Sequence, residues 1–139
     1  MQKLFRGGGT LAQTLNDVPR CINEMIKENY KKIADIKCDV SLSNNYTNKI
    51  PLNLSFKPSK VIFLISAENI YGETEETWVS TEDYNETDGV IFSMYGKVTL
   101  TGEFTEKPVI TEKEMILKIQ YSLYSDSRTP KIIRCIAIE

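Results

Sequence analysis

The chain of 139 residues contains no histidine and only three cysteines. Without histidine, neither Ser-His-Asp nor Cys-His catalysis is available, and the commonest zinc ligand is missing. Cys21, Cys38 and Cys135 lie far apart and form no CxxC pair, which argues against a disulfide framework or a zinc site. We expect these cysteines to be buried thiols. We also expect a protein that is not an enzyme, uses no cofactor and holds no metal.

Long apolar runs and an excess of basic residues are also missing. No run approaches the roughly 18 residues that a membrane-spanning helix needs, and the N-terminus lacks the apolar region of a conventional signal peptide. The net charge is −2 and the pI is about 5.3, whereas a general nucleic-acid binder presents a basic surface. We therefore expect no membrane or nucleic-acid partner, and synthesis in the cytoplasm with any release by another route.

The N-terminal part of the chain divides into a flexible stretch and one helical pattern. Residues 1–14 contain Gly7-Gly8-Gly9 among polar residues and are typical of a linker. Residues 17–37 favour an amphipathic helix, with Pro19 in its first turn. We accordingly predict a unit at 1–37, followed by a second domain at 38–139.

The apolar stripe of this helical pattern allows two interpretations. The helix could pack on its own domain, or it could form a short parallel coiled coil in which Asn29 fixes the register. The second interpretation predicts an oligomerisation stalk, that of a homotrimer. Its contacts would be made by Leu15, Val18, Ile22, Met25, Asn29, Ile33 and Ile36.

From residue 38 onward the hydrophobic period changes from that of a helix to that of a strand. The clearest case is "EMILKIQYSLYS" at 114–125, where apolar and polar residues alternate as in an antiparallel strand with one face in the core. The runs 61–65 and 132–138 are almost entirely apolar, which places them centrally. The pattern predicts a mainly β fold, an antiparallel β-sandwich or jelly-roll-like domain with an N-terminal α-helix. The expected strands are 38–42, 52–56, 61–67, 77–80, 90–94, 97–104, 114–124 and 131–138.

An acidic stretch at 73–88 carries no basic residue to balance it. Within it, Asp83, Asn85 and Asp88 offer oxygen ligands before Gly89, as a calcium loop does. The spacing departs from the EF-hand by one extra residue before the glycine, and no glutamate follows at the required offset. A solvated acidic loop is the favoured interpretation and a bound cation the alternative.

Aromatic residues suggest a second kind of site. A platform of tyrosine and tryptophan rings, rimmed by acids and amides, would suit the stacking of a sugar ring, although such rings also serve ordinary cross-strand packing. Trp78 lies in the polar stretch "ETEETWVSTEDY" and is the ring expected to be partly exposed. The candidate binding residues are Trp78, Tyr84, Tyr71, Asp83 and Asn85, with Tyr95, Tyr121 and Tyr124 as further aromatics.

Two short motifs give the chain a resemblance to a known group. Phe56, Pro58 and Val61 in "SFKPSKVIFLIS" and the ending "IIRCIAIE" resemble segments of the C-terminal domains of phage tail and tail-fibre proteins, in which a strand ends in Phe-x-Pro and the last strand closes in a similar run. Cys135 stands where an aromatic residue is more usual. The helical pattern also resembles the short trimerising stalk of such domains.

This resemblance implies a non-enzymatic structural protein of a phage, a prophage or a phage-tail-like bacteriocin. Its expected partners are copies of itself, other tail proteins and a bacterial surface glycan acting as receptor. Two alternatives follow: a baseplate or assembly protein that binds only tail proteins, and a free carbohydrate-binding module. An exposed aromatic groove would favour glycan binding, whereas a large exposed apolar patch would favour assembly.

Overall fold

The structure is a computed structural model, and it describes residues 32–84 and 90–139. No helix in these two ranges is long and apolar enough to cross a membrane. The regular elements within them are nine strands and one short 3-10 turn. In chain order they are β1 (Ile33–Ser41), β2 (Thr47–Pro51), β3 (Lys60–Glu68), β4 (Thr74–Ser80), η1 (Thr81–Asp83), β5 (Phe92–Tyr95), β6 (Thr99–Phe104), β7 (Val109–Ile110), β8 (Glu114–Leu123) and β9 (Lys131–Ile138).

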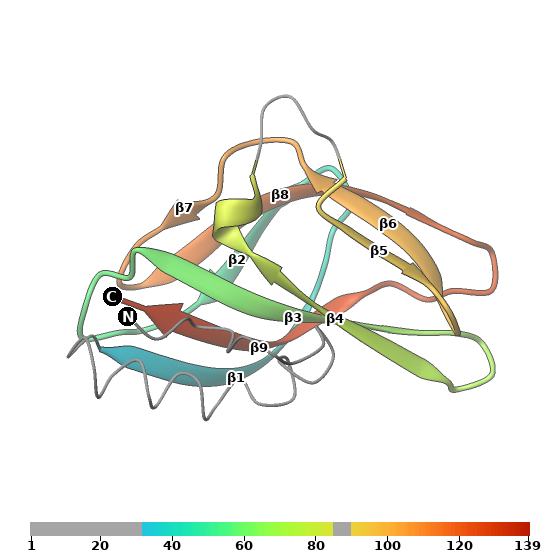
Figure 1. Ribbon diagram of the computed structural model, residues 1–139, viewed down its shortest axis with the longest axis horizontal. Coiled ribbons are helices and arrows are strands. Elements are labelled where there is room, and N and C mark those ends of the chain that lie inside the picture. Colours follow the sequence, from blue (N-terminus) through green and yellow to red (C-terminus); the bar gives the residue numbers. More distant parts are fainter. Residues whose placement is uncertain (1–31, 85–89) are drawn as a thin grey trace, which may run out of the picture.

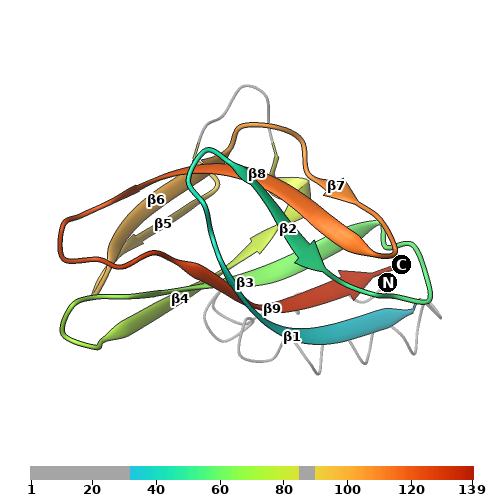
Figure 2. The same cartoon turned by 180° about the vertical axis from the view of Figure 1, so that it is seen from behind.

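The strands form two antiparallel sheets, which lie one over the other in Figures 1 and 2. The first sheet has the order β1-β9-β3-β4. The second has the order β2-β8-β6-β5, with β7 paired to β8. The prediction of a mainly β fold is therefore confirmed.

A single hydrophobic core fills the space between the two sheets. Phe63 of β3 meets Phe104 of β6 edge to face, with ring centroids 6.3 Å apart. The alternation predicted for β8 is confirmed, because Met115, Leu117 and Ile119 all point into this core and are fully buried. Such alternation is what buries one face of a sheet and leaves the other facing away from the core.

The central strands β3 and β9 bury residues on both of their faces. Their inward residues, such as Phe63 and Cys135, belong to the core between the sheets. Their outward residues are also apolar and buried, with exposed fractions of 3% for Ile62 and 0% for Ile136. The nearly unbroken apolar runs 61–65 and 132–138 are thus explained by burial on two sides, and their predicted central position is confirmed.

The prediction that the helix extends to residue 37 is wrong, because residues from Ile33 onward form a strand. Ile33 and Ile36 belong to strand β1, which pairs with β9 and crosses the expected unit boundary between residues 37 and 38. Ile36 points towards the core, and Ile33 pairs with Ile138. Apolar residues at 33, 34 and 36 fit both the period of a helix and the period of a strand. The hydrogen-bonded pairing with β9 makes this segment a strand. The remaining stripe residues, Leu15 to Asn29, lie outside the described residues.

The predicted strand 52–56 is also wrong. Asn53 has a positive φ of 52°, so the chain turns there, and the amides of Leu52 and Leu54 donate to the carbonyls of Lys113 and Glu112. Leu52 and Phe56 are nevertheless buried, which accounts for the alternating pattern. The sequence does not predict β2 or β7. Strand β2 is polar, ends in Pro51 and buries only Asn48 and Ile50. Strand β7 has only two residues.

The two segments that carry the family resemblance are neighbours in space. Phe56 and Val61 both anchor in the core, and Pro58 between them is buried. The amide of Ser59 donates to the carbonyl of Ile138 at 2.8 Å, and Val61 then pairs with Ala137. The Phe-x-Pro corner therefore starts β3 directly against the end of β9.

Two of the three cysteines meet in the core region. The Sγ atoms of Cys38 and Cys135 lie 3.9 Å apart, and both thiols are free. Cys135 is fully buried, as predicted, whereas Cys38 is half-buried; Cys21 lies outside the described residues. Burial raises the pKa of both thiols, which keeps them protonated and poorly nucleophilic.

Gly102 of β6 lies directly against the ring of Phe92, which leaves no room for a side chain. A Cβ atom at this position of β6 would collide with the ring of Phe92 on β5. We expect Gly102→Ala to lower the free energy of unfolding by about 1–3 kcal/mol, as overpacked cores do, measured by urea denaturation. Thr101→Ala, one position away and facing outward, serves as control. Adding Phe92→Leu should cost less in the Gly102→Ala background than in the parent; equal costs would contradict the collision.

Candidate functional site

Trp78 lies on the outer face of the four-stranded sheet, where it is half-buried rather than open. It pairs with Leu64 of β3, and the guanidinium carbon of Arg134 lies 5.8 Å from the centroid of its ring. Arg134 in turn donates two hydrogen bonds to the carboxylate of Asp35 on β1. This cation–π contact covers part of the ring, so Trp78 is not a free platform for stacking.

Tyr84 and Asp83 make contacts within the domain, away from Trp78. The ring of Tyr84 packs towards the core, with its centroid 6.5 Å from that of Phe104. Asp83 accepts a hydrogen bond from the amide of Ser80 and so completes a capping box around η1. Asn85 lies outside the described residues. Trp78 and Tyr84 therefore lie on different faces, one beside Arg134 and the other beside Phe104.

Tyr71 lies in the β3–β4 turn with 74% of its surface exposed. The turn is organised by Asn69, which is buried although its side chain is polar. The side-chain oxygen of Asn69 accepts hydrogen bonds from the amides of Tyr71 and Glu73, at 2.9 and 3.0 Å. Its amide nitrogen donates to the carbonyl of Lys97 at 3.0 Å, in the turn that joins β5 to β6.

Three turns are joined at this end of the molecule, which we call the tip. They are the turns β3–β4 (69–73), β5–β6 (96–98) and β8–β9 (124–130), and they lie on the right in Figure 1. Besides the link from Asn69 to Lys97, Asn69 forms a β-bridge with Ser127, and the amide of Arg128 donates to the carbonyl of Glu68 at 2.8 Å. These bonds tie the three turns to one another, and such preorganisation lowers the ordering cost of binding.

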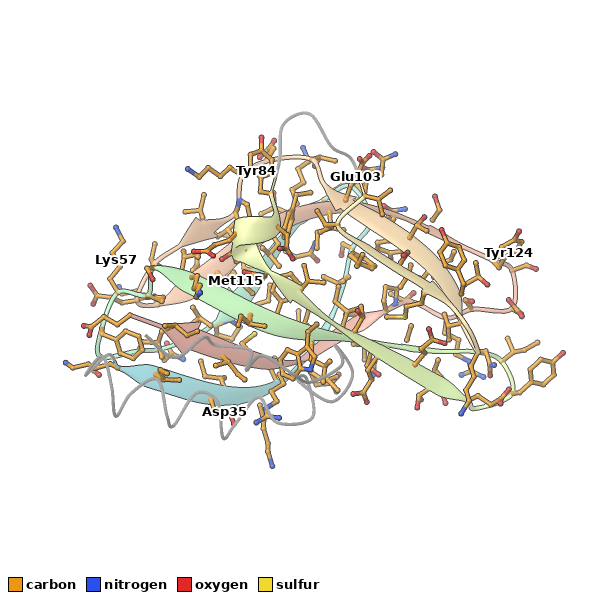
Figure 3. All side chains as sticks on the ribbon, in the orientation of Figure 1. Asp35, Lys57, Tyr84, Glu103, Met115 and Tyr124 are labelled. Atoms are coloured by element: carbon orange, nitrogen blue, oxygen red, sulfur yellow. The ribbon has the colours of Figure 1, made fainter. Side chains whose placement is uncertain are left out.

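An open groove of about 310 Å³ begins at the tip and follows the outer face of β5, β6 and β8. Tyr95 and Tyr124 border it and are 73% and 66% exposed; Tyr124 is labelled in Figure 3. Hydroxyl side chains line the strand surface between these two rings. The residues of this groove, which we call the tyrosine groove, are Tyr95, Thr99, Thr101, Ser122, Leu123 and Tyr124.

The chemistry of the tyrosine groove suits a polar, ring-shaped ligand. A tyrosine side chain combines a flat apolar ring with a polar hydroxyl group at low conformational cost. The hydroxyl groups of Thr99, Thr101 and Ser122 can each donate and accept hydrogen bonds. A groove of this kind can stack a sugar ring and bond its hydroxyls, but it brings together no acid–base pair.

Two glutamates of the acidic stretch, Glu73 and Glu75, make hydrogen bonds within the tip. Glu73 accepts a hydrogen bond from Asn69, and Glu75 accepts one from the amide of Lys97 at 2.7 Å. Within residues 32–84 and 90–139, no three acidic or cysteine side chains are grouped to hold a metal ion. Asp88, the remaining oxygen donor of the proposed calcium loop, lies outside these ranges.

Sequence reasoning named two rings of the groove but missed most of its floor. Tyr95 and Tyr124 belong to the further aromatics and not to the predicted binding residues. In "TLTGEF", Thr99 and Thr101 alternate with Leu100 and Gly102, and this alternation is the signal that the two hydroxyls share an outward face. Nothing in the sequence places Ser122 beside Thr101, because that depends on the pairing of β6 with β8.

Comparisons with protein families, with curated proteins and with solved structures find no match to this chain.

Asn69 provides a test of the tip. We expect Asn69→Ala to lower the free energy of unfolding by about 1–3 kcal/mol, because it leaves several backbone groups without a partner. Hydrogen exchange should accelerate at the amides of Tyr71 and Glu73 in particular. Asn44→Ala is the matched control, since Asn44 also bonds a backbone but at Tyr121, outside the three turns. Unchanged exchange at both amides in Asn69→Ala would show that Asn69 does not hold the turn.

The ion pair beside Trp78 predicts a pH dependence. Hydrogen bonds from Arg134 lower the pKa of Asp35 in the folded protein. Asp35 therefore adds stability above its unfolded pKa of about 4, and this stability is lost as the pH falls through the lower folded value. We expect Asp35→Asn to reduce the urea midpoint at neutral pH but to match the parent in strong acid.

Asp39→Asn is the control for that experiment. Asp39 forms an ion pair with Lys131 at 3.4 Å, but its side chain is 74% exposed, and such surface pairs contribute little. A midpoint difference for Asp35→Asn that persists unchanged in acid would mean that charge pairing with Arg134 is not its cause.

Proposed function

We propose that this protein is a non-enzymatic binding module of a phage tail or a phage-tail-like particle, and that its tyrosine groove binds a glycan of the bacterial surface. The observation that carries the proposal is the groove itself, in which Tyr95 and Tyr124 flank a row of hydroxyl side chains. The two exposed rings lie on one sheet face and are available to a ligand.

The position of the groove supports a binding role. Tyr95 is the last residue of β5, and Tyr124 is the first residue after β8, so both rings lie at strand ends. The amide of Tyr124 donates to the carbonyl of Thr99, which ties the second ring to the groove floor. Sites built on strands hold their geometry better than sites on free loops. A shallow groove of this kind gives modest affinity, and an array of copies on a particle would raise it through multivalency.

The assignment to a tail-like particle rests on the resemblance of two segments. It is supported by the way the Phe56-Pro58-Val61 corner joins the end of β9 through Ser59 and Ile138. The corner fixes the start of a central strand, which suits a rigid domain exposed outside a cell. We also interpret the two antiparallel sheets as a β-sandwich, because residues of both sheets share one hydrophobic core.

A second candidate function is assembly with other tail proteins. It is favoured by the apolar surface of the β3–β4 turn, where Ile70 and Tyr71 are 52% and 74% exposed side by side. Exposed apolar residues at a tip can fit a pocket of a partner protein. In that case the β3–β4 turn, and not the tyrosine groove, would form the centre of the interface.

Substitution of the groove tyrosines tests the glycan proposal. We expect binding to a panel of purified bacterial surface polysaccharides, with Tyr95→Ala and Tyr124→Ala each weakening it about tenfold or more, as loss of a central aromatic anchor does. Isothermal titration calorimetry against the best-binding polysaccharide would measure the change.

Tyr46→Ala is the matched control, because Tyr46 is 73% exposed but lies in the β1–β2 connection. It should leave the affinity unchanged. If no polysaccharide binds, or if all three variants bind like the parent, the groove is not a glycan site. Loss of particle assembly on Tyr71→Ala would then favour the second candidate function.

A further inference from the structure

The thiols of Cys38 and Cys135 face each other across two neighbouring strands. Cys38 lies on β1 and Cys135 on β9, 97 residues apart in the chain, and their Sγ atoms are separated by 3.9 Å. Cys135 belongs to the core between the sheets, and Cys38 packs against that core. Two cysteines can be bridged without a large backbone movement only where their side chains point towards each other. This pair meets that condition.

The pairing of β1 with β9 is irregular beside Cys38. Lys37 pairs with Arg134 and Val40 pairs with Ile132, so two residues of β1 lie opposite one residue of β9. A bulge of this kind disrupts the ladder locally and leaves the backbone freer to adjust. The two sulfurs have to approach by about 2 Å to reach the length of an S–S bond. Rotation of the two side chains and a small shift of the bulge can supply this movement.

The two thiols differ in their access to solvent. Cys135 is fully buried on a central strand, whereas Cys38 is half-buried on β1, the outer strand in the order β1-β9-β3-β4. A small oxidant therefore reaches the sulfur of Cys38 first. Cys135 lies behind it, in the position of a second thiol that completes the reaction.

We propose that Cys38 and Cys135 are an oxidation site, at which a peroxide converts the two thiols into a disulfide bond that fastens β1 to β9. Hydrogen peroxide first oxidises the thiol of Cys38 to a sulfenic acid, and one molecule of water is released. The sulfur of Cys135 then attacks the sulfur of Cys38. The S–S bond forms, and the hydroxyl group leaves with the proton of Cys135 as a second water. In total, two thiols are oxidised and one peroxide is reduced to two waters.

This proposal is independent of the glycan function and concerns different residues. Burial raises the pKa of both thiols, so they react slowly, and a reducing cytoplasm keeps such a pair reduced. An oxidising medium outside a cell would close the bond. The bond would join an edge strand, which opens more readily than a central one, to the middle of the sheet. It would therefore stabilise the domain after release from a cell.

Peptide mapping of the unsubstituted protein tests the proposal directly. The protein is treated with hydrogen peroxide, its remaining thiols are alkylated, and it is digested with trypsin without reductant. Trypsin cleaves after Lys37, Lys49 and Arg134, so we expect peptides 38–49 and 135–139 to be linked. Dithiothreitol should separate them. Absence of the linked pair, its presence only in a covalent dimer, or links to Cys21 in its place would overturn the proposal.

Urea denaturation measures the effect of the bond on stability. The cross-link spans 97 residues of the chain, so the urea midpoint of the oxidised parent should exceed that of the reduced parent by about 1 M or more. Cys21→Ala and Cys38→Ala are matched variants, because each removes one thiol. Cys21→Ala should retain this gain on oxidation, and Cys38→Ala should lose it.

Each comparison is made between the oxidised and reduced forms of one variant, so a change in the stability of the reduced form does not affect the result. A gain in Cys38→Ala equal to that of the parent would contradict the proposed pairing. Loss of the gain in Cys21→Ala would assign the bond to Cys21. Neither readout depends on whether the tyrosine groove binds a glycan.

Discussion

The pairing of β3 with β9 is the constraint on which the rest of the structure depends. These two strands place Phe63 and Cys135 between the sheets and Ile62 and Ile136 on the opposite face, all four of them buried. A slip by one residue in this register would exchange the two faces, and it would move the Ser59 corner away from Ile138. The corner, the edge strands β1 and β4, and both candidate surfaces are positioned relative to this pair.

This constraint explains which parts of the fold can be predicted from the sequence. An apolar run without alternation has to be buried on two sides, so the central position of β3 and β9 follows from residues 61–65 and 132–138 alone. The alternation in β8 is equally direct, since Met115, Leu117 and Ile119 share one face. Leu52 and Phe56 suggest a strand because both are buried. The segment is not a strand, since the positive φ of Asn53 turns the chain between them. Ile33 and Ile36 mislead because three or four apolar residues fit either period.

The candidate site is less accessible to sequence reasoning than the fold, for a physical reason. Aromatic residues can be recognised in a sequence, but their grouping depends on strand order and on the direction in which each side chain points. Trp78 and Tyr84 are only six residues apart, yet one lies under Arg134 on the outer face and the other beside Phe104 in the core. Tyr95 and Tyr124 are far apart in sequence and line one groove, because β6 lies between β5 and β8.

The two surfaces impose different physical requirements on the same small domain. The tyrosine groove needs rings that stay in water and still hold their positions, and the buried Asn69 supports this by tying the β3–β4 turn to Lys97 beside it. The outward face of the four-stranded sheet has the opposite requirement, because isoleucine and leucine side chains left exposed on a sheet face promote association. Ile62 and Ile136 meet that requirement, since both are buried. The tip, by contrast, leaves Tyr71 and Tyr124 in water, where they can contact another molecule.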